Sequence, residues 1–502
     1  MTCVHKMWDF VGAFFIAAVV SAAVSAADVP AADTHSGPLL SLEEAIRLGL
    51  NRNQDIKVES YAPGIARANV LAALGQFDPA LNFGRSYSRS FGYPSVPAPL
   101  PPTLVETDSY SLVLNGVLPT GLNYTIGGSA ENERGPYNQF RADYLTFGGV
   151  SLAQPLLRGF GFAANLVNVR VARANRSISE WQYRQTVIDT VTNVILTYNE
   201  LVLAHDDLRI ARRYRELGAT LLTESLQRLK AGSGAQGDVI TARAQVASRE
   251  EGILEAENAV RSTDNQLREL LGEKSFPPDQ ALLTVEAPPV PAVTVDPAGD
   301  YQEALNRRPD YQAARLGISI NRATTAAARN GVLPQMNLVA GYGYNGLAST
   351  FVASRQMVAA RDVPSSSIGI NLSIPITNAQ ARGRARAARL TLEQSEASLK
   401  DLEAQIALSV ANAASQIATA RKRVVADRSA YDLATEALAG EEKKLQLGTS
   451  TSFNVIQDQT NLATVENSLA SARFAESQAA AVYEQQLGLT LVRNHIALAE
   501  DK

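Results

Sequence analysis

The chain has 502 residues, of which 46% are hydrophobic and 19% are charged, and its formal net charge at pH 7 is -4. This composition is that of an ordinary folded protein, and the slightly negative charge gives no basis for a nucleic-acid partner. Lys6 is followed by an apolar run from Phe10 to Val20 and then by small residues up to Ala27. We therefore expect residues 1–27 to be a signal peptide and the protein to act outside the cytoplasm.

The cysteine content and the hydropathy limit the possible chemistry and membrane contact. Cys3 is the only cysteine and lies ahead of the apolar run, so it is lost with the signal peptide. The mature chain would then have no disulfide and no thiol chemistry. No stretch after Ala27 approaches 18 uninterrupted apolar residues, and we expect no membrane-spanning helix. Any membrane contact would involve strands or the protein surface.

One unit of sequence occurs twice in the chain. Gln54–Tyr87 aligns without gaps with Pro309–Tyr342, and Gly232–Gly272 aligns with Gly448–Gly488. Internal repetition of this kind indicates a duplicated structural unit. The predicted organisation, in chain order, is a first repeat (28–272), a Pro-rich linker of the equatorial region (273–300), a second repeat (301–490) and a C-terminal tail (491–502).

Each repeat is predicted to contain a helix, strands, a very long helix, a tip and a further helix. In the first repeat these are strands about 80–153, a long helix about 165–230, a tip at 231–238 and a helix at 238–271. In the second repeat they are strands about 335–375, a long helix about 378–447, a tip at 448–454 and a helix at 454–487.

The strands are predicted from alternation of large apolar residues with small or polar ones, as in Leu81, Phe83 and Tyr87 or in Ile368, Ile370 and Leu372. The pattern gives four strong strands and up to six in all. An additional hairpin over 110–129 reverses at the turn 119–121.

The long helices lack proline and are rich in Ala, Leu, Glu, Gln and Arg. At 1.5 Å per residue each would span roughly 100 Å, far more than a compact domain. Such a helix needs neighbours along its whole length, and two shorter helices stacked end to end would supply them. Pro63 and Gly64 should break the first short helix, whereas the second repeat has no such break.

Gly232, Gly234 and Gly237 have the GxGxxG spacing of a dinucleotide-binding loop. That loop requires a preceding strand, whereas a long predicted helix precedes these glycines. The twin segment retains only Gly448, the counterpart of Gly232. We therefore expect Gly232 to take the left-handed conformation that ends a helix.

Several motifs occur in a specific order: "SLEEAIRLGLNRNQDI", the strand entries "FDPAL" and "LPQMN", "SLAQPLL" and "NLSIPIT" before the long helices, and the tips "KAGSGAQGDVITARAQV" and "QLGTSTSFNVIQDQTNL". In this order the chain resembles the TolC family of outer-membrane efflux proteins. The resemblance implies a mainly α fold with a β-barrel portion, a homotrimer with a shared barrel in outer-membrane lipid, and an α-helical barrel of coiled-coil character in the periplasm.

The resemblance also implies a function. The protein would be the outer-membrane channel of a tripartite efflux or type I secretion system, exporting small toxic compounds or proteins. Its partners would be a periplasmic adaptor protein and an inner-membrane pump. Three chains with four strands each would close a barrel of twelve. The hairpin over 110–129 exceeds that number, and the sequence leaves open whether it enlarges the barrel or forms an extracellular loop.

By the same resemblance, the two tips narrow the duct and dock the adaptor. The candidate tip and gate residues are Gly232, Asp238, Gly448, Asn454, Gln457 and Asp458. Relatives carry two aspartates near the second tip, where this chain has the neutral Asn454 and Gln457. The negative charge of an entrance ring could come from Asp238 instead, which also suits a helix N-terminus.

No catalytic, cofactor-binding or metal-binding residues are expected. His35, His205 and His495 have no partner at ligand spacing. Glu43 and Glu44 follow Ser41 as acidic residues of a capped first turn. Several arginines follow the last strand of each repeat: Arg158, Arg170, Arg173 and Arg176 in the first repeat, and those of the segment Arg382–Leu390 in the second. We expect them either to contact lipid phosphates or to line a solvated helix face.

A periplasmic coiled-coil adaptor or scaffold without a membrane barrel is the alternative function. It explains the helices but leaves the alternating aromatic strands without a role.

Overall fold

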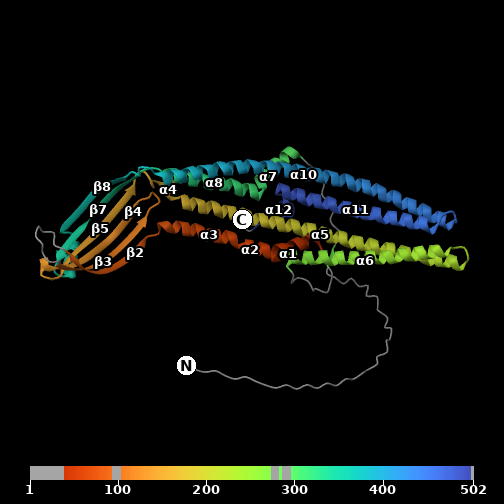
Figure 1. Ribbon diagram of the computed structural model, residues 1–502, viewed down its shortest axis with the longest axis horizontal. Helices are drawn as coiled ribbons and strands as arrows, with labels where there is room; N and C mark the ends of the chain where they lie inside the picture. The colour runs from red at the N-terminus through yellow and green to blue at the C-terminus, as the bar shows by residue number, and fades with distance from the viewer. Residues whose placement is uncertain (1–38, 93–102, 273–281, 285–295, 499–502) are drawn as a thin grey trace, which may run out of the picture.

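The computed structural model describes residues 39–92, 103–272, 282–284 and 296–498. A β-sheet lies at one end of an elongated molecule, and paired helices run from it to two turns at the opposite end (Figure 1). The predicted signal peptide and most of the predicted linker lie outside the described residues.

Six antiparallel strands form one sheet in the order β2-β3-β4-β5-β7-β8. Their bounds are β2 (Ala80–Gly92), β3 (Thr103–Val117), β4 (Asn123–Arg134), β5 (Asp143–Pro155), β7 (Gln335–Ala348) and β8 (Val363–Ser373). The hairpin expected over 110–129 is therefore part of the sheet, as β3 and β4. The sequence pattern predicted four strong strands and up to six in all, and the structure has six strands in one sheet, each paired along nearly its full length.

The two faces of the sheet differ in polarity. The register places Leu81, Leu114, Ile126 and Val150 in one row across four strands, and β8 adds Ile368 and Ile370 to the same face. The opposite face carries mainly small and polar side chains, including Asn82, Ser86, Ser88, Thr125, Ser129, Ser365, Ser367 and Asn371. An apolar outer face and a polar inner face are typical of a transmembrane β-barrel wall.

A helix absent from the sequence-based expectation, α9 (Phe351–Ala360), joins β7 to β8. Thr350 caps it by accepting a hydrogen bond from the backbone N–H of Ala353 at 3.4 Å. It lies against β5 and β7 at the end of the sheet far from the long helices (Figure 1).

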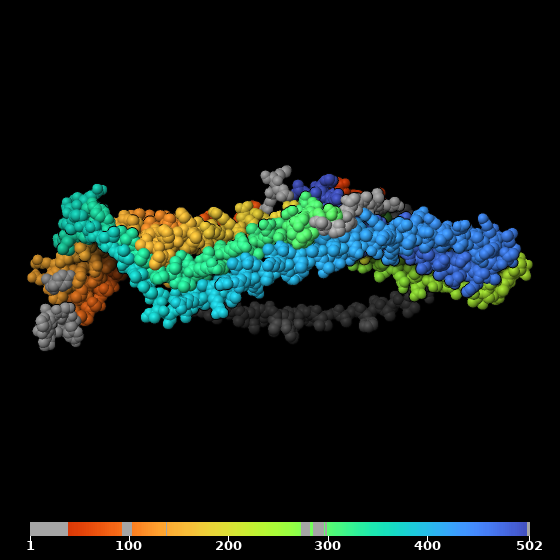
Figure 2. Space-filling view, turned by 90° about the horizontal axis from the view of Figure 1, so that it is seen from above, coloured from red at the N-terminus to blue at the C-terminus, as the bar shows by residue number. Residues whose placement is uncertain are grey.

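Two long helices form the body of the molecule, α5 (Val167–Lys230) and α10 (Ala379–Gln446). Shorter helices pack along them end to end: α3 (Tyr61–Leu74) and α6 (Gln236–Leu271) along α5, and α8 (Pro309–Asn330) and α11 (Ser452–Leu487) along α10. Figure 2 shows α8 lying beside α10. The remaining short elements are α1 (Leu42–Arg52), α2 (Gln54–Glu59), η1 (Gly75–Phe77), η2 (Pro136–Asn138), α4 (Phe162–Asn165), α7 (Pro297–Arg307) and α12 (Thr490–Arg493).

The helix expected near 52–76 is interrupted. It consists of α2 and α3 with a boundary at Ser60, three residues before Pro63. A proline ring clashes with the carbonyl four residues earlier and has no N–H to donate, which explains a break at this point. The predicted cap of α1 is confirmed, because the Ser41 hydroxyl accepts the backbone N–H of Glu44 at 3.2 Å.

The middle of the molecule is held together by a short parallel sheet of β1 (Leu39–Leu40) and β6 (Leu283–Thr284). The Tyr198 hydroxyl on α5 donates to the Leu40 carbonyl at 2.9 Å, and both residues are almost completely buried. Residues 282–284 of the predicted linker are therefore anchored against the middle of α5.

By length and composition alone, α5 is the one described helix that could cross a membrane. It contains an 18-residue window of mean hydropathy 1.2. However, 61% of that window is buried inside the protein. Its apolar side chains thus belong to the main hydrophobic core, around Val187, Val194 and Leu201.

Candidate functional site: the two tips and the cluster between the hairpins

The two long helices end in the same way. Gly232 and Gly448 have left-handed φ angles of +72° and +73°. After α5, the N–H of Ser233 donates to the Arg228 carbonyl at 2.9 Å, and after α10 the N–H of Thr449 donates to the Lys444 carbonyl at the same distance. These are Schellman turns, in which glycine is the residue most often found at the left-handed position. The left-handed conformation predicted for Gly232 is confirmed.

The first tip is short and largely exposed. Its second helix, α6, begins at Gln236, two residues earlier than expected, and Asp238 lies in its first turn. Asp238 is half-buried and has no ion-pair partner among the described residues. A carboxylate in this position is stabilised by the partial positive charge of the helix N-terminus. The preceding long helix also shows that these glycines do not form a dinucleotide-binding loop.

The second tip has its own cap and ion pair. Thr451 accepts the backbone N–H of Asn454 at 3.4 Å and so caps α11. Glu441 accepts hydrogen bonds from the Ser450 hydroxyl and, at 2.9 Å, from Lys444. These contacts, that of Ser450 first, lower the pKa of the Glu441 carboxyl. Glu441 therefore remains charged beside the tip at neutral pH.

The other candidate residues of the second tip differ in exposure. Asn454 and Gln457 are exposed on α11, whereas Asp458 is half-buried. Asn454 occupies the same position in α11 that Asp238 occupies in α6, three residues after the N-cap. Both tips lie at the same end of the molecule (Figure 1). The chain thus offers one acidic and one neutral residue at equivalent positions of the two tips.

A polar cluster joins the two helical hairpins at a distance from the tips. The Tyr214 hydroxyl on α5 donates to the Glu466 carboxylate on α11 at 3.0 Å, and the Arg213 guanidinium donates to the same oxygen. The side chain of Glu466 is only 11% exposed. Burial is the main cause that raises the pKa of Tyr214 to about 12, so this hydroxyl keeps its proton and remains a donor.

A second arginine completes the cluster from α6. Arg249 donates through Nη1 to the Tyr214 carbonyl and, at 3.4 Å, to the Gln459 side chain on α11. Its Nη2 atom is buried without a hydrogen-bond partner, and burial lowers the pKa of the guanidinium. Three helices of two hairpins thus meet at one partly buried group of charges, the Tyr214 cluster (Arg213, Tyr214, Arg249, Gln459 and Glu466).

One feature of the repeat alignment points to this cluster. Glu250 and Glu466 occupy equivalent positions of the two repeats. In the structure Glu250 pairs with Arg215 at 3.0 Å within the first hairpin, whereas Glu466 pairs across to that hairpin. The shared glutamate is visible in the alignment, but its partners depend on how the hairpins pack.

Within the described residues, no group of three or more His, Cys, Asp or Glu side chains could hold a metal ion. The His205 ring lies 3.1 Å from the Leu282 carbonyl and so anchors the linker segment. Of the arginines after the last strand of each repeat, Arg176 pairs with Glu180 at 2.8 Å and Arg389 pairs with Glu393 at 2.8 Å. Both pairs lie on exposed helix faces.

Comparison with known proteins identifies the family. The family model of the outer membrane efflux protein matches residues 117–273 and 301–488, which together make up more than half of the chain. The chain belongs to the outer membrane efflux protein family. These two segments each contain a long helix, a tip and the helix that follows.

Individual relatives agree with this assignment. The chain is 23% identical over 349 residues to the outer membrane protein TolC of Vibrio cholerae, covering 67% of this chain and 77% of that protein. It is 24% identical over 351 residues to the outer membrane efflux protein BepC of Brucella suis, covering 67% and 72%. The outer membrane channel CmeC of Campylobacter jejuni has the same fold, with a TM-score of 0.65 and 14% identity over 89% of this chain and 86% of that one.

This outer membrane efflux protein is therefore a channel of the outer membrane for efflux or type I secretion, with a helical portion in the periplasm. The alternative of a periplasmic scaffold without a membrane portion is wrong, because the family and the two-faced sheet both place the chain in the outer membrane. The roles of the individual tip residues remain predictions.

Proposed function

We propose that three copies of this chain close one barrel of eighteen strands, six from each copy, and continue it as a helical duct through the periplasm. The observation that carries the proposal is the open sheet with one apolar face. In the lipid core, unpaired backbone groups at a sheet edge cost several kcal/mol each. Such a sheet is therefore stable in a membrane only when its edges are paired.

The two edge strands suit pairing between copies. β2 begins at the helical end of the sheet and β8 ends there, so they run in opposite directions. The β8 strand of one copy can therefore pair antiparallel with the β2 strand of the next. Because each copy contributes an even number of strands, neighbouring strands would alternate in direction around the whole ring. Barrels of 16 to 18 strands leave an aqueous channel. The face of this sheet that carries small and polar side chains would line that channel.

The tips would form the periplasmic entrance. A periplasmic adaptor would dock there and connect the channel to an inner-membrane pump. In a ring of three copies, Asp238 would supply three negative charges at the first tips, whereas the equivalent Asn454 and the nearby Gln457 would add no charge at the second tips. Such an entrance would attract cations less strongly than one with acidic residues at both tips.

Disulfide crosslinking between the edge strands tests the proposal. The only native cysteine is Cys3, in the predicted signal peptide, so introduced cysteines would pair with each other. Ser86→Cys on β2 is combined in turn with Ser365→Cys, Ser367→Cys and Ser373→Cys on β8, all on the polar face. We expect covalent trimers after oxidation for at least one pair.

A matched control uses the neighbouring strand. Ser86 lies opposite Ser109 of the same chain, so Ser86→Cys with Ser109→Cys should give disulfide-bonded monomers. Monomers from all three β2–β8 pairs, with the control disulfide formed, would contradict closure by these edges.

A further inference from the structure

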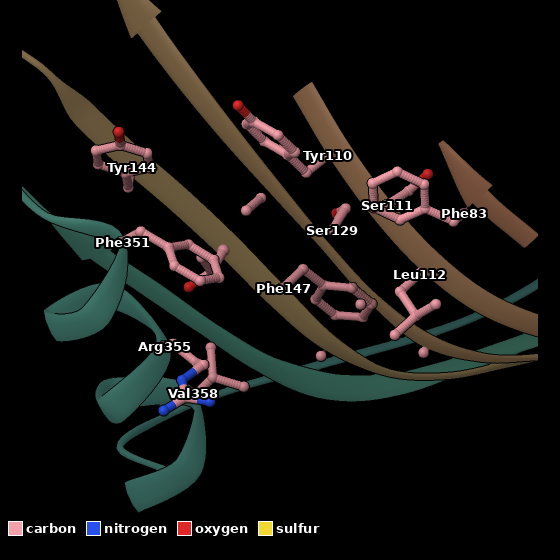
Figure 3. Close-up of a pocket in the computed structure, with 15 residues that line it drawn as sticks. Phe83, Tyr110, Ser111, Leu112, Ser129, Tyr144, Phe147, Phe351, Arg355 and Val358 are labelled. Atoms are coloured by element: carbon pink, nitrogen blue, oxygen red, sulfur yellow. The ribbon is translucent and has the colours of Figure 1, made fainter. Parts of the chain in front are cut away.

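The helix α9 creates a groove on the apolar face of the sheet. Figure 3 shows Phe351 extending from α9 over the sheet that carries Phe83, Tyr110 and Leu112, with Arg355 and Val358 next to each other on the same helix. The cavity has a volume of about 740 Å³. Gly128, Thr146 and Gly148 of the sheet also line it.

Small residues beneath α9 fix its position. Ser354 is completely buried, and its hydroxyl donates to the Gly346 carbonyl at 3.0 Å and is hydrogen-bonded to Thr146. A Cβ at Gly346 would lie 2.1 Å from the Ser354 carbonyl oxygen, and one at Gly148 would lie 2.9 Å from Val358. The helix therefore rests directly on the backbone of β5 and β7, which holds the groove open beside it.

The register shows which side of the wall carries the groove. Phe83, Leu112, Gly128 and Gly148 lie in one row and alternate with the small polar residues of the other face. The same face continues into Ile368 and Ile370, which an outer-membrane barrel turns toward lipid. The groove thus faces lipid, at the end of the sheet away from the periplasmic helices. In the membrane, this end of the sheet would lie in the outer leaflet.

Among the described residues that line the groove, Arg355 is the only charged side chain. Arg85 pairs with Asp108 at 3.3 Å, and Tyr110 also donates to Asp108 at 2.8 Å. Arg355 is exposed at the groove and has no ion pair with a described residue. A guanidinium at the edge of an apolar groove matches a phosphate attached to an acyl chain.

We propose that this groove binds a phosphorylated glycolipid of the outer leaflet, with an acyl chain along Phe83, Leu112 and Val358 and a phosphate at Arg355. The apolar lining provides for the chain, since each buried CH₂ contributes about 0.8 kcal/mol. The outer-leaflet depth favours the glycolipid over a phospholipid of the inner leaflet. The inference rests on the proposed placement of the sheet in a barrel wall.

Lipid binding to the purified full-length oligomer tests this inference. The oligomer in detergent would be titrated with hexa-acylated lipid A and, in a parallel experiment, with phosphatidylglycerol. Native mass spectrometry would measure the amount of lipid bound at each step. We expect lipid A to bind and Arg355→Gln to weaken its binding by roughly tenfold, the effect of losing a charged hydrogen bond. Arg361→Gln, which removes a charge just after α9 but outside the groove, should leave binding unchanged.

A second pair of variants tests the acyl chain. Leu112 is 54% exposed, so Leu112→Trp should narrow the groove without disturbing the core and should weaken lipid A binding. Leu114→Trp, on the same strand and face but outside the groove, should not. Tighter binding of phosphatidylglycerol than of lipid A, or equal effects of Arg355→Gln and Arg361→Gln, would overturn the inference. A conducting wild-type oligomer that binds no lipid A would overturn this inference alone and leave the proposed function intact.

Discussion

Gly232 and Gly448 occupy equivalent positions of the two repeats and end α5 and α10 with φ angles one degree apart. A Cβ at either position would meet no neighbouring atom within 4 Å. The requirement for glycine is therefore conformational and does not come from packing. Each tip depends on one residue that can reverse a long helix.

We predict that Gly232→Ala destabilises the first tip by about 1–2 kcal/mol, the cost of a left-handed conformation for a residue with a Cβ. Amide hydrogen exchange at Ser233, whose N–H closes the turn, would measure it. Gly237→Ala is the control, because Gly237 lies in the first turn of α6 and not in the left-handed region. Equal exchange rates in the two variants would contradict this account.

For the entrance, Asp238→Asn should weaken the block of conductance by multivalent cations in a planar bilayer. Three copies would lose three charges at one ring, and we expect the blocking concentration to rise roughly tenfold. Asp458→Asn is the comparison variant. Asp458 is half-buried on α11, one turn beyond Asn454, which is the equivalent of Asp238 in the second repeat. An unchanged block in Asp238→Asn would remove Asp238 from the entrance.

The Tyr214 cluster should restrain the separation of the hairpins. Glu466→Gln removes the charge that holds Arg213 and Tyr214, at a cost of about 1–3 kcal/mol. We expect separation of the two hairpins to open the channel, so this cost would shift the ratio of closed to open channels by roughly tenfold. Single-channel recording would detect the shift as a higher open fraction. Glu250→Gln, which breaks a pair within one hairpin, should leave gating unchanged. The same increase in both variants would argue against a specific role of the cluster.

A pH dependence is expected from Asp207 on α5. Burial, with repulsion from Asp206, raises the pKa of its carboxyl to about 6, and its Oδ1 atom is buried without a partner. The folded state therefore binds the proton more tightly than the unfolded state. Its stability falls as the pH rises from about 4 to about 6 and stays lower above that range.

Replacing Asp207 by asparagine should remove this penalty. We expect Asp207→Asn to raise the thermal midpoint at pH 7 and to flatten its dependence between pH 4 and pH 6. Asp206→Asn, at the neighbouring carboxylate, should have a smaller effect. A lower midpoint for Asp207→Asn at pH 7 would contradict the prediction.

Features set by local chemistry could be predicted from the sequence. The reversal at Gly232, the cap at Ser41 and the break before Pro63 each depend on a few adjacent residues, and the repeat supplied a second copy of the tip for comparison. The alternation in β3 and β4 also predicted a hairpin, although the family resemblance left its place in the sheet open.

Features that depend on distant contacts could not be predicted. The ten residues of α9 are too few to establish a helical period, and the helix is held in place by Ser354, Thr146 and Gly346 from three elements. The Tyr214 cluster likewise depends on packing between residues about 250 positions apart. Neither contact leaves a pattern within one segment of sequence.

Electron cryomicroscopy of the purified oligomer in lipid nanodiscs would test the central claim most directly. Adjacent strands lie about 4.8 Å apart, so a map that separates them allows the wall to be counted. The account predicts eighteen strands, with β3 and β4 of each copy inside the wall and β8 paired with β2 of the next copy. A wall of twelve strands, with β3 and β4 outside it, would contradict the account.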